Sequence, residues 1–153
     1  MPTLDDVYRK FGEASEAAQL LETELGNILI KIGVAEENLF SESNPERTSA
    51  LFKKINRQTL GQLLKNVNNS TESVSHLEAL LSCALAERNR LSHSFYRRHN
   101  FRRNSEEGRM LMLKDLESSH DTLLEAYKAV MLLSGIDLDA TVMAQLPTKH
   151  VPI

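Results

Sequence analysis

Apolar residues recur along the first part of the chain at alternating steps of three and four, the spacing of one face of an α-helix. The positions form one stripe, Leu4, Val7, Phe11, Ala14, Ala18, Leu21, Leu25, Ile28 and Ile32. Gly33 follows the stripe and is a suitable stop, so a first long helix is predicted over residues 4–32. A seam this regular can pack within one chain or across a dimer interface, and the spacing leaves both alternatives open.

A second long helix is predicted to start at Asn69, because Glu72 lies three residues later, as in a capping box. Its apolar stripe comprises Val74, Leu77, Leu81, Ala84 or Leu85, Leu91 and Phe95. Arg88 occupies the position in this stripe where an apolar residue is expected. An unpaired buried charge is costly. Either the stripe opens to solvent there or Arg88 faces an acid, such as Glu87 or one on the first helix.

A third long helix is predicted to begin at Ser105 and to end at Gly135. Glu106 and Glu107 support this start, because acidic side chains are favourable at a helix N-terminus. The expected apolar face comprises Met110, Leu113, Leu116, His120, Leu123, Tyr127, Val130 and Met131. We expect His120 to be a core histidine whose polar atoms find partners within the chain.

Two short helices are predicted between the first two long ones. One begins at Pro45 after the cap Asn44 and runs to Asn56, and the other runs from Thr59 to Val67. The predicted fold is therefore all-α, an antiparallel helical bundle of about three long and two short helices. We expect a single domain over residues 1–135 and an extended C-terminal tail over residues 136–153.

The composition of this 153-residue chain, with 41% apolar and 25% charged residues, is that of a globular protein. The single cysteine, Cys83, excludes an intramolecular disulfide framework, and its apolar neighbours predict a buried, inert thiol. No segment approaches the roughly 20 apolar residues that span a bilayer, and Asp5 and Asp6 argue against a signal peptide. We therefore expect a cytoplasmic protein that does not contact a membrane.

Positive charge is concentrated in residues 88–103, RNRLSHSFYRRHNFRR, which hold six arginines, two histidines, three aromatic residues and no acid. Without these arginines the chain has 12 basic residues against 21 acidic ones, a balance of −9. Such a local excess indicates a polyanionic partner, since guanidinium groups pair bidentately with phosphate. The alternative is a solvated helix end and loop whose arginines pair with acids of the same chain.

Within this stretch, ERNRLSHSFY resembles the signature of HEPN domains: an arginine, a polar residue, a short spacer and a histidine. Arg88, Asn89 and His93 occupy these positions in a small all-helical chain. The resemblance implies a metal-independent endoribonuclease, or a non-catalytic RNA-binding relative, that forms a homodimer with the two motifs facing each other. Many HEPN proteins act in toxin–antitoxin and phage-defence systems, often beside a nucleotidyltransferase-type antitoxin. Some of those toxins have a tyrosine two residues after the histidine, where this chain has Phe95, with Tyr96 one residue further on.

The chemistry of RNA cleavage gives the candidate catalytic residues separate roles. The 2′-hydroxyl of RNA is the nucleophile, so a proton-transferring group and a cation near the phosphate suffice. His93 suits the first role, because imidazoles titrate near neutral pH, and Arg88 suits the second. On a straight helix these residues diverge by about 140°, which favours a composite site over a single-chain one. Asn89 shares a face with His93 and could orient its imidazole.

This scheme requires neither a metal nor a cofactor, and none is predicted. The candidate RNA contacts are arginines that grip phosphates and a tyrosine that stacks on unpaired bases. They are Arg90, Tyr96, Arg97, Arg98, His99, Arg102 and Arg103. Phe95 and Phe101 are instead expected to anchor the core. The alternative function is a non-catalytic interaction module that binds RNA or an acidic partner protein through the arginine-rich segment.

Overall fold

The computed structural model describes residues 1–36, 75–140 and 148–150. Every regular element within them is helical, so the all-α bundle predicted from the apolar pattern is confirmed. The three long helices are α1 (Leu4–Glu36), α4 (Ser75–His93) and α6 (Glu106–Leu133). The two predicted short helices and the predicted helix start at Asn69 lie outside the described residues.

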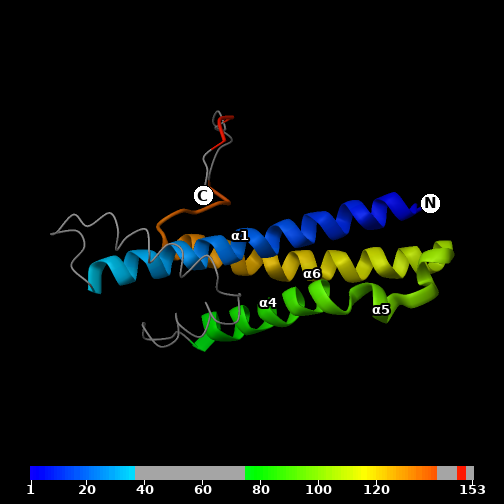
Figure 1. The fold of residues 1–153 in the computed structure, drawn as a ribbon, viewed down its shortest axis with the longest axis horizontal. Helices are drawn as coiled ribbons and strands as arrows, with labels where there is room; N and C mark the ends of the chain where they lie inside the picture. Colours follow the sequence, from blue (N-terminus) through cyan, green and yellow to red (C-terminus); the bar gives the residue numbers. More distant parts are fainter. Residues whose placement is uncertain (37–74, 141–147, 151–153) are drawn as a thin grey trace.

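Helices α1 and α6 run side by side in the same direction, and α4 runs opposite to both (Figure 1). At one end of the pair, Arg109 Nε donates to the carbonyl oxygen of Pro2 at 2.7 Å. Towards the other end, the Ser134 hydroxyl donates to Glu24 Oε1 at 2.6 Å. The order is therefore up, down, up, and the N-terminus lies at the same end of the bundle as the start of α6.

Helix α1 begins at a capping box. The backbone N–H of Asp6 donates to Thr3 Oγ1 at 3.1 Å, and the Thr3 N–H donates to Asp6 Oδ2 at 2.8 Å. Hydrogen bonds from Thr3 to the carboxylate lower the pKa of Asp6. At its other end, α1 continues past Gly33 to Glu36, so the predicted stop is wrong. One glycine costs a helix only about 1 kcal/mol and does not by itself end a helix of 33 residues.

The core follows the α1 stripe. Most of its predicted positions are buried against α4 and α6, so this seam packs within the single chain. The buried apolar residues of α1 are Val7, Ala14, Ala17, Ala18, Leu21, Leu25 and Ile30. Facing them are Leu81, Ala84 and Leu91 of α4, and Phe95 just after it. The predicted stripe of α4 is thus confirmed over the described part, including the core role of Phe95.

The buried face of α6 matches the predicted one at Leu116, Leu123, Val130 and Met131, but not at its N-terminal end. It consists of Met112, Leu116, Ser119, Leu123, Ala126 and Val130, with Met131 at its edge. The predicted core residue Met110 is 57% exposed, whereas Ser119 is fully buried. Ser119 belongs to this face because its hydroxyl lies between α6 and α4, where it donates to Glu87 Oε2 at 2.6 Å.

Both predicted ends of α6 are confirmed. The Ser105 hydroxyl accepts the backbone N–H of Gly108 at 3.1 Å, as an N-cap does. At the other end, Gly135 has φ +80°. Gly135 N donates to Leu132 O and Ile136 N donates to Met131 O, the paired bonds of a Schellman motif.

The segment between α4 and α6 is helical rather than the predicted loop. A bend at Ser94 separates α4 from the short helix α5 (Phe95–His99), which the 3-10 helix η1 (Asn100–Asn104) follows. The Ser94 N–H still donates to Arg90 O at 3.0 Å, so the chain changes direction without losing that helical bond. Because η1 buries none of its residues, Phe101 is 76% exposed and its predicted core role is wrong.

Cys83 corrects another prediction. Its thiol is exposed rather than buried, because α4 turns a single stripe towards α1 and α6 and Cys83 lies off that stripe. Residues 138–140 form a turn, while most of the predicted extended tail lies outside the described residues. Among the described helices, none has the length and apolar character needed to cross a membrane.

Candidate functional site

Arg88 faces an acid of the first helix, one of the two alternatives that the sequence left open. Its Nε donates to Glu22 Oε1 at 2.8 Å, across the gap between α4 and α1. Both side chains are mostly covered, Arg88 being 22% exposed and Glu22 25%. Nη1 of Arg88 also donates to Asn89 Oδ1 at 3.2 Å. The apolar stripe of α4 therefore tolerates Arg88 because Glu22 balances its charge.

The outer edge of the Arg88 guanidinium has hydrogen-bonding capacity left. Within the described residues, no acceptor contacts Nη2, and only one bond involves Nη1. Arg88 lines a groove of about 390 Å³ between α1 and α4. The other lining residues are Phe11, Ser15, Ala18, Gln19 and Glu22 from α1 and Leu91 and Ser92 from α4. An open groove beside an arginine with free N–H groups can accept an anion.

His93 is the last residue of α4, and its side chain is exposed. No hydrogen bond or ion pair of its imidazole occurs among the described residues; only its carbonyl oxygen accepts a bond, from Arg97 Nη2 at 3.1 Å. Arg88 and His93 make no contact with each other. Asn89 bonds to Arg88 rather than to His93. The motif thus presents two separate groups, a held arginine in a groove and a free imidazole at the end of the helix.

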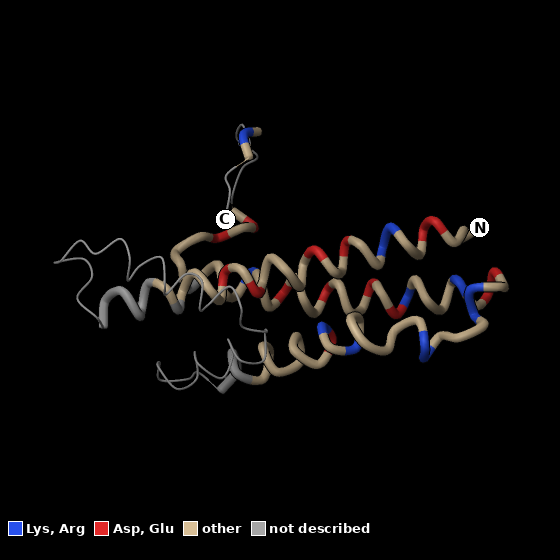
Figure 2. Tube along the Cα trace, viewed as in Figure 1, with Lys and Arg blue, Asp and Glu red and all other residues tan. Residues whose placement is uncertain are grey.

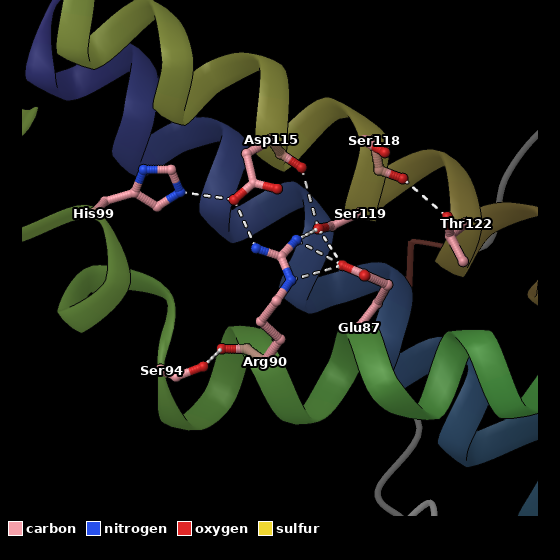
Figure 3. Close-up of polar contacts among 8 residues, drawn as sticks. All are labelled: Glu87, Arg90, Ser94, His99, Asp115, Ser118, Ser119 and Thr122. Carbon is pink, nitrogen blue, oxygen red and sulfur yellow. Dashed lines mark hydrogen bonds and ion pairs between the residues drawn. The ribbon is translucent and has the colours of Figure 1, made fainter.

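Arg90 lies at the centre of a polar network that joins α4 to α6 (Figure 3). Nη1 donates to Asp115 Oδ2 at 2.6 Å, while Nε and Nη2 donate to Glu87 Oε2 at 3.1 and 2.7 Å. Nη2 also contacts the buried hydroxyl of Ser119, which donates to Glu87 Oε2 at 2.6 Å. All three guanidinium nitrogens are engaged, so this predicted RNA contact has little capacity left for phosphate.

His99 extends the network on the other side of Asp115. It is 5% exposed, and its Nε2 lies 2.7 Å from Asp115 Oδ2. Nδ1 lies 3.1 Å from Arg102 Nη1, an arginine donor, so the imidazole accepts there and its proton lies on Nε2, towards Asp115. His99 was a predicted RNA contact, and the fold buries it as a link between α5 and α6.

The pKa values of the network follow from its hydrogen bonds. For Asp115, burial alone would raise the pKa, but hydrogen bonds from Arg90 and His99 outweigh it and lower the pKa. For Arg90, burial alone would lower the pKa, and hydrogen bonds to Asp115 and Glu87 outweigh it and raise the pKa. Both groups are therefore held in their charged forms by each other.

The remaining predicted RNA contacts lie on α5 and η1, and all of them are exposed to some degree. Arg97, Arg98, Arg102 and Arg103 are exposed, and Tyr96 is 37% exposed while its ring packs against Tyr8 and Phe11. Burial, with a smaller effect of Tyr8, raises the pKa of Tyr96. Figure 2 shows acidic residues along α1 and α6 but none between α4 and α6.

The close packing of η1 against α6 depends on Gly108. A Cβ at this position would sit 2.1 Å from the carbonyl oxygen of Arg102, a separation that no real side chain allows. The backbone of η1 therefore comes against the first turn of α6 only because residue 108 lacks a side chain. This close approach places Arg102 beside His99 and Arg103 beside Tyr8, whose hydroxyl accepts from Arg103 Nη2 at 2.8 Å.

Sequence reasoning did not identify the residues that organise the site from outside the motif. They are Glu22, Asp115 and Ser119. Asp115 and Ser119 are four residues apart on one helix face, a spacing that brings side chains together. That spacing is common, and only the packing of α6 against α4 shows that they share a partner in Arg90. His120 of α6 is partly buried, and its Nδ1 lies 3.0 Å from Lys10 Nζ, as expected of a satisfied core histidine.

No three potential metal-ligating side chains cluster within the part of the chain that the structure describes. The candidate site therefore consists of Arg88, Asn89 and His93 with Glu22, beside a structural network around Arg90. Comparison of the chain with protein-family models, with curated proteins and with solved structures gives no match.

Proposed function

We propose that the chain is a metal-independent endoribonuclease of HEPN type that acts as a homodimer. The observation that carries the proposal is the state of Arg88. Glu22 holds the arginine at the motif position in a groove, and among the described residues three N–H protons at its outer edge have no acceptor and can bind a phosphate. The imidazole of His93, which is exposed in the described part of the chain, adds a group that can move protons.

The proposed reaction uses the RNA's own nucleophile. A neutral imidazole accepts the proton of a 2′-hydroxyl, whose oxygen then attacks the adjacent phosphorus. The bond to the 5′-oxygen breaks, and that oxygen takes up a proton from water, while the imidazolium returns its own proton to the solvent. The products end in a 2′,3′-cyclic phosphate and a 5′-hydroxyl. Arg88 stabilises the charge that gathers on the non-bridging oxygens.

A composite site accounts for the separation of the two groups within one chain. Arg88 faces α1, whereas His93 is exposed and makes no contact with it. We therefore propose that Arg88 of one protomer and the histidine at position 93 of its partner act on the same phosphate. In this proposal the cellular role is that of a toxin or phage-defence effector, with a nucleotidyltransferase-type protein as a candidate antitoxin.

The test is cleavage of single-stranded RNA in excess EDTA. Wild-type protein should cleave it and leave cyclic phosphate ends, and Arg88→Ala and His93→Ala should each lower the rate by about 100-fold or more. Arg9→Ala and His150→Ala are matched controls, because both residues are exposed and lie outside the motif. Cleavage that EDTA abolishes, or that survives in folded His93→Ala, would contradict the assignment.

A second candidate function is a non-catalytic module that binds RNA or an acidic protein. It is favoured by the exposed side chains of Arg97, Arg98 and Phe101, since a base can stack on the phenyl ring while guanidinium groups contact phosphates. This alternative predicts RNA binding that weakens steeply between 50 and about 200 mM salt, with no turnover. Replacing Arg97 and Arg98 together should weaken binding and leave the unfolding midpoint unchanged.

A further inference from the structure

We infer that Glu22 of α1 is a positioning residue for Arg88: it holds the guanidinium so that its outer edge faces the groove between α1 and α4. The inference rests on the proposed function and adds to it a residue 66 positions away from Arg88 in the sequence. It follows from three features: the single contact between the two side chains, the N–H groups left free, and the place of the pair in the groove.

The contact between Glu22 and Arg88 is of a kind that orients the arginine without occupying it. A carboxylate that saturates an arginine takes two of its N–H groups in parallel. Here Oε1 of Glu22 takes only the Nε proton, at 2.8 Å. The bond fixes the plane and direction of the guanidinium group at its inner edge. The pair of nitrogens at the outer end, Nη1 and Nη2, then forms the fork that suits two oxygens of one phosphate.

Asn89 completes the support without closing that fork. Its Oδ1 accepts from Nη1 at 3.2 Å, a longer bond than that to Glu22 and one between neighbouring residues. One proton on Nη1 and both on Nη2 have no acceptor among the described residues. Two fixed points, one on α1 and one on α4, thus hold a long and flexible side chain in one conformation before any ligand arrives.

The burial of the pair makes the orientation effective. With about three-quarters of each side chain covered, water competes less for their hydrogen bond than it would on an open surface. Glu22 also cancels the charge of Arg88 in the empty groove. A phosphate in the groove is then bound by directed hydrogen bonds rather than by a net positive charge. The main effect of Glu22 is therefore to orient Arg88 for the transition state.

Two substitutions separate orientation from charge. Glu22→Gln keeps an oxygen that accepts from Nε but removes the negative charge, whereas Glu22→Ala removes both. If Glu22 orients Arg88, Glu22→Ala should lower kcat by about tenfold or more, and Glu22→Gln should keep kcat within about threefold of wild type. KM should stay unchanged or fall in both variants, because a repulsive charge near the substrate phosphate has been removed.

Glu13→Ala is the matched control. Glu13 lies on the same helix and pairs with Lys10 at 3.0 Å, away from Arg88. Its removal should leave kcat and KM as in wild type. Circular dichroism and urea unfolding of each variant establish that the proteins compared are folded at the assay temperature.

The experiment is RNA cleavage kinetics for wild type, Arg88→Ala and these three variants. Loss of kcat in Glu22→Ala with rescue in Glu22→Gln supports the inference. Wild-type kcat in folded Glu22→Ala beside inactive Arg88→Ala overturns it and leaves the proposed function intact, and so does a folded Glu22→Gln that has lost kcat. If Glu22→Ala does not fold, Glu22→Met takes its place, because methionine keeps the length of the side chain but offers Nε of Arg88 no oxygen. Absence of cleavage by wild type overturns the proposed function, and this inference with it.

Discussion

Arg88 and Arg90 lie two residues apart on α4, and they face different neighbours. Arg90 points towards α6. Glu87 of its own helix, together with Asp115 and Ser119 of α6, engages all three of its nitrogens. Arg88 points towards α1, where Glu22 accepts one of its protons, and within the described ranges its Nη2 has no acceptor. Arg90 is 16% exposed and Arg88 is 22% exposed, so burial hardly distinguishes them. The two arginines differ instead in the number of acceptors around each guanidinium group.

This difference shows that the six arginines of residues 88–103 do not serve one purpose. Part of the local positive charge is neutralised within the chain, as the alternative reading of the sequence supposed. Another part, on α5 and η1, is exposed, and these two elements contain no acid. Arg88 lies between these cases, because it is paired and yet still has donors to offer. An arginine can therefore be structurally tolerated and chemically available at once.

The largest expected effect concerns stability. Arg90→Ala leaves Glu87 and Asp115 without their shared cation, and breaking a buried pair in this way costs about 3–5 kcal/mol. Because both acids are roughly a quarter to a third exposed, we expect the lower end of that range or slightly less, about 2–3 kcal/mol. Arg88→Ala should cost about 1 kcal/mol or less. Urea unfolding at one fixed protein concentration measures both.

Equal losses of unfolding free energy in the two variants would contradict the distinction drawn between these arginines. Arg9→Ala, which removes an exposed i,i+3 pair with Asp6, provides a baseline for a surface arginine. It should fall within about 0.5 kcal/mol of wild type.

A smaller effect should appear as a dependence on pH. Hydrogen bonds from Arg90 and His99 lower the pKa of Asp115 below its ordinary value of 3.8. A carboxyl whose pKa is lower in the folded state stabilises the fold above the unfolded pKa, and this contribution disappears as pH falls through the folded pKa. Asp115→Asn removes that titration. The loss of unfolding free energy between pH 5 and about pH 3 should therefore be smaller in Asp115→Asn than in wild type.

The control for this pH comparison is Asp121→Asn, which changes an exposed acid on the same helix. Its stability should fall with pH as steeply as that of wild type. If Asp115→Asn loses stability just as steeply below pH 5, then the network does not hold Asp115 in its charged form.

The smallest effect is expected at Cys83, on the side of α4 that faces neither α1 nor α6. Cys83→Ser should change the unfolding free energy by less than about 0.5 kcal/mol, because the exposed thiol makes no buried contacts. Reaction of the native protein with a thiol reagent should be complete without denaturant. A loss of 2 kcal/mol or a protected thiol would show that this face of α4 is covered in solution.

The sequence predicted the positions where periodicity and caps act locally. Each of these features depends on residues within a turn or two of each other. They are the stripe of α1, the core role of Phe95, the start of α6 at Ser105 and its end at Gly135. The predictions that Cys83, Phe101 and Met110 are buried were wrong for one common reason. A residue's apolar character says that burial would be favourable, but whether a neighbouring helix is there to bury it depends on the direction in which each helix face points.

For the candidate site, the amino-acid sequence determined which groups are available: an arginine, an amide and an imidazole at fixed spacing on one helix, followed by a basic turn. It could not decide which arginine would be occupied, because Glu22 lies 66 residues before Arg88 and Asp115 lies 25 residues after Arg90. Only the packing of α4 against α1 on one side and α6 on the other made that choice. Hydrogen bonds act over about 3 Å, so partners far apart in the sequence are set by the fold alone.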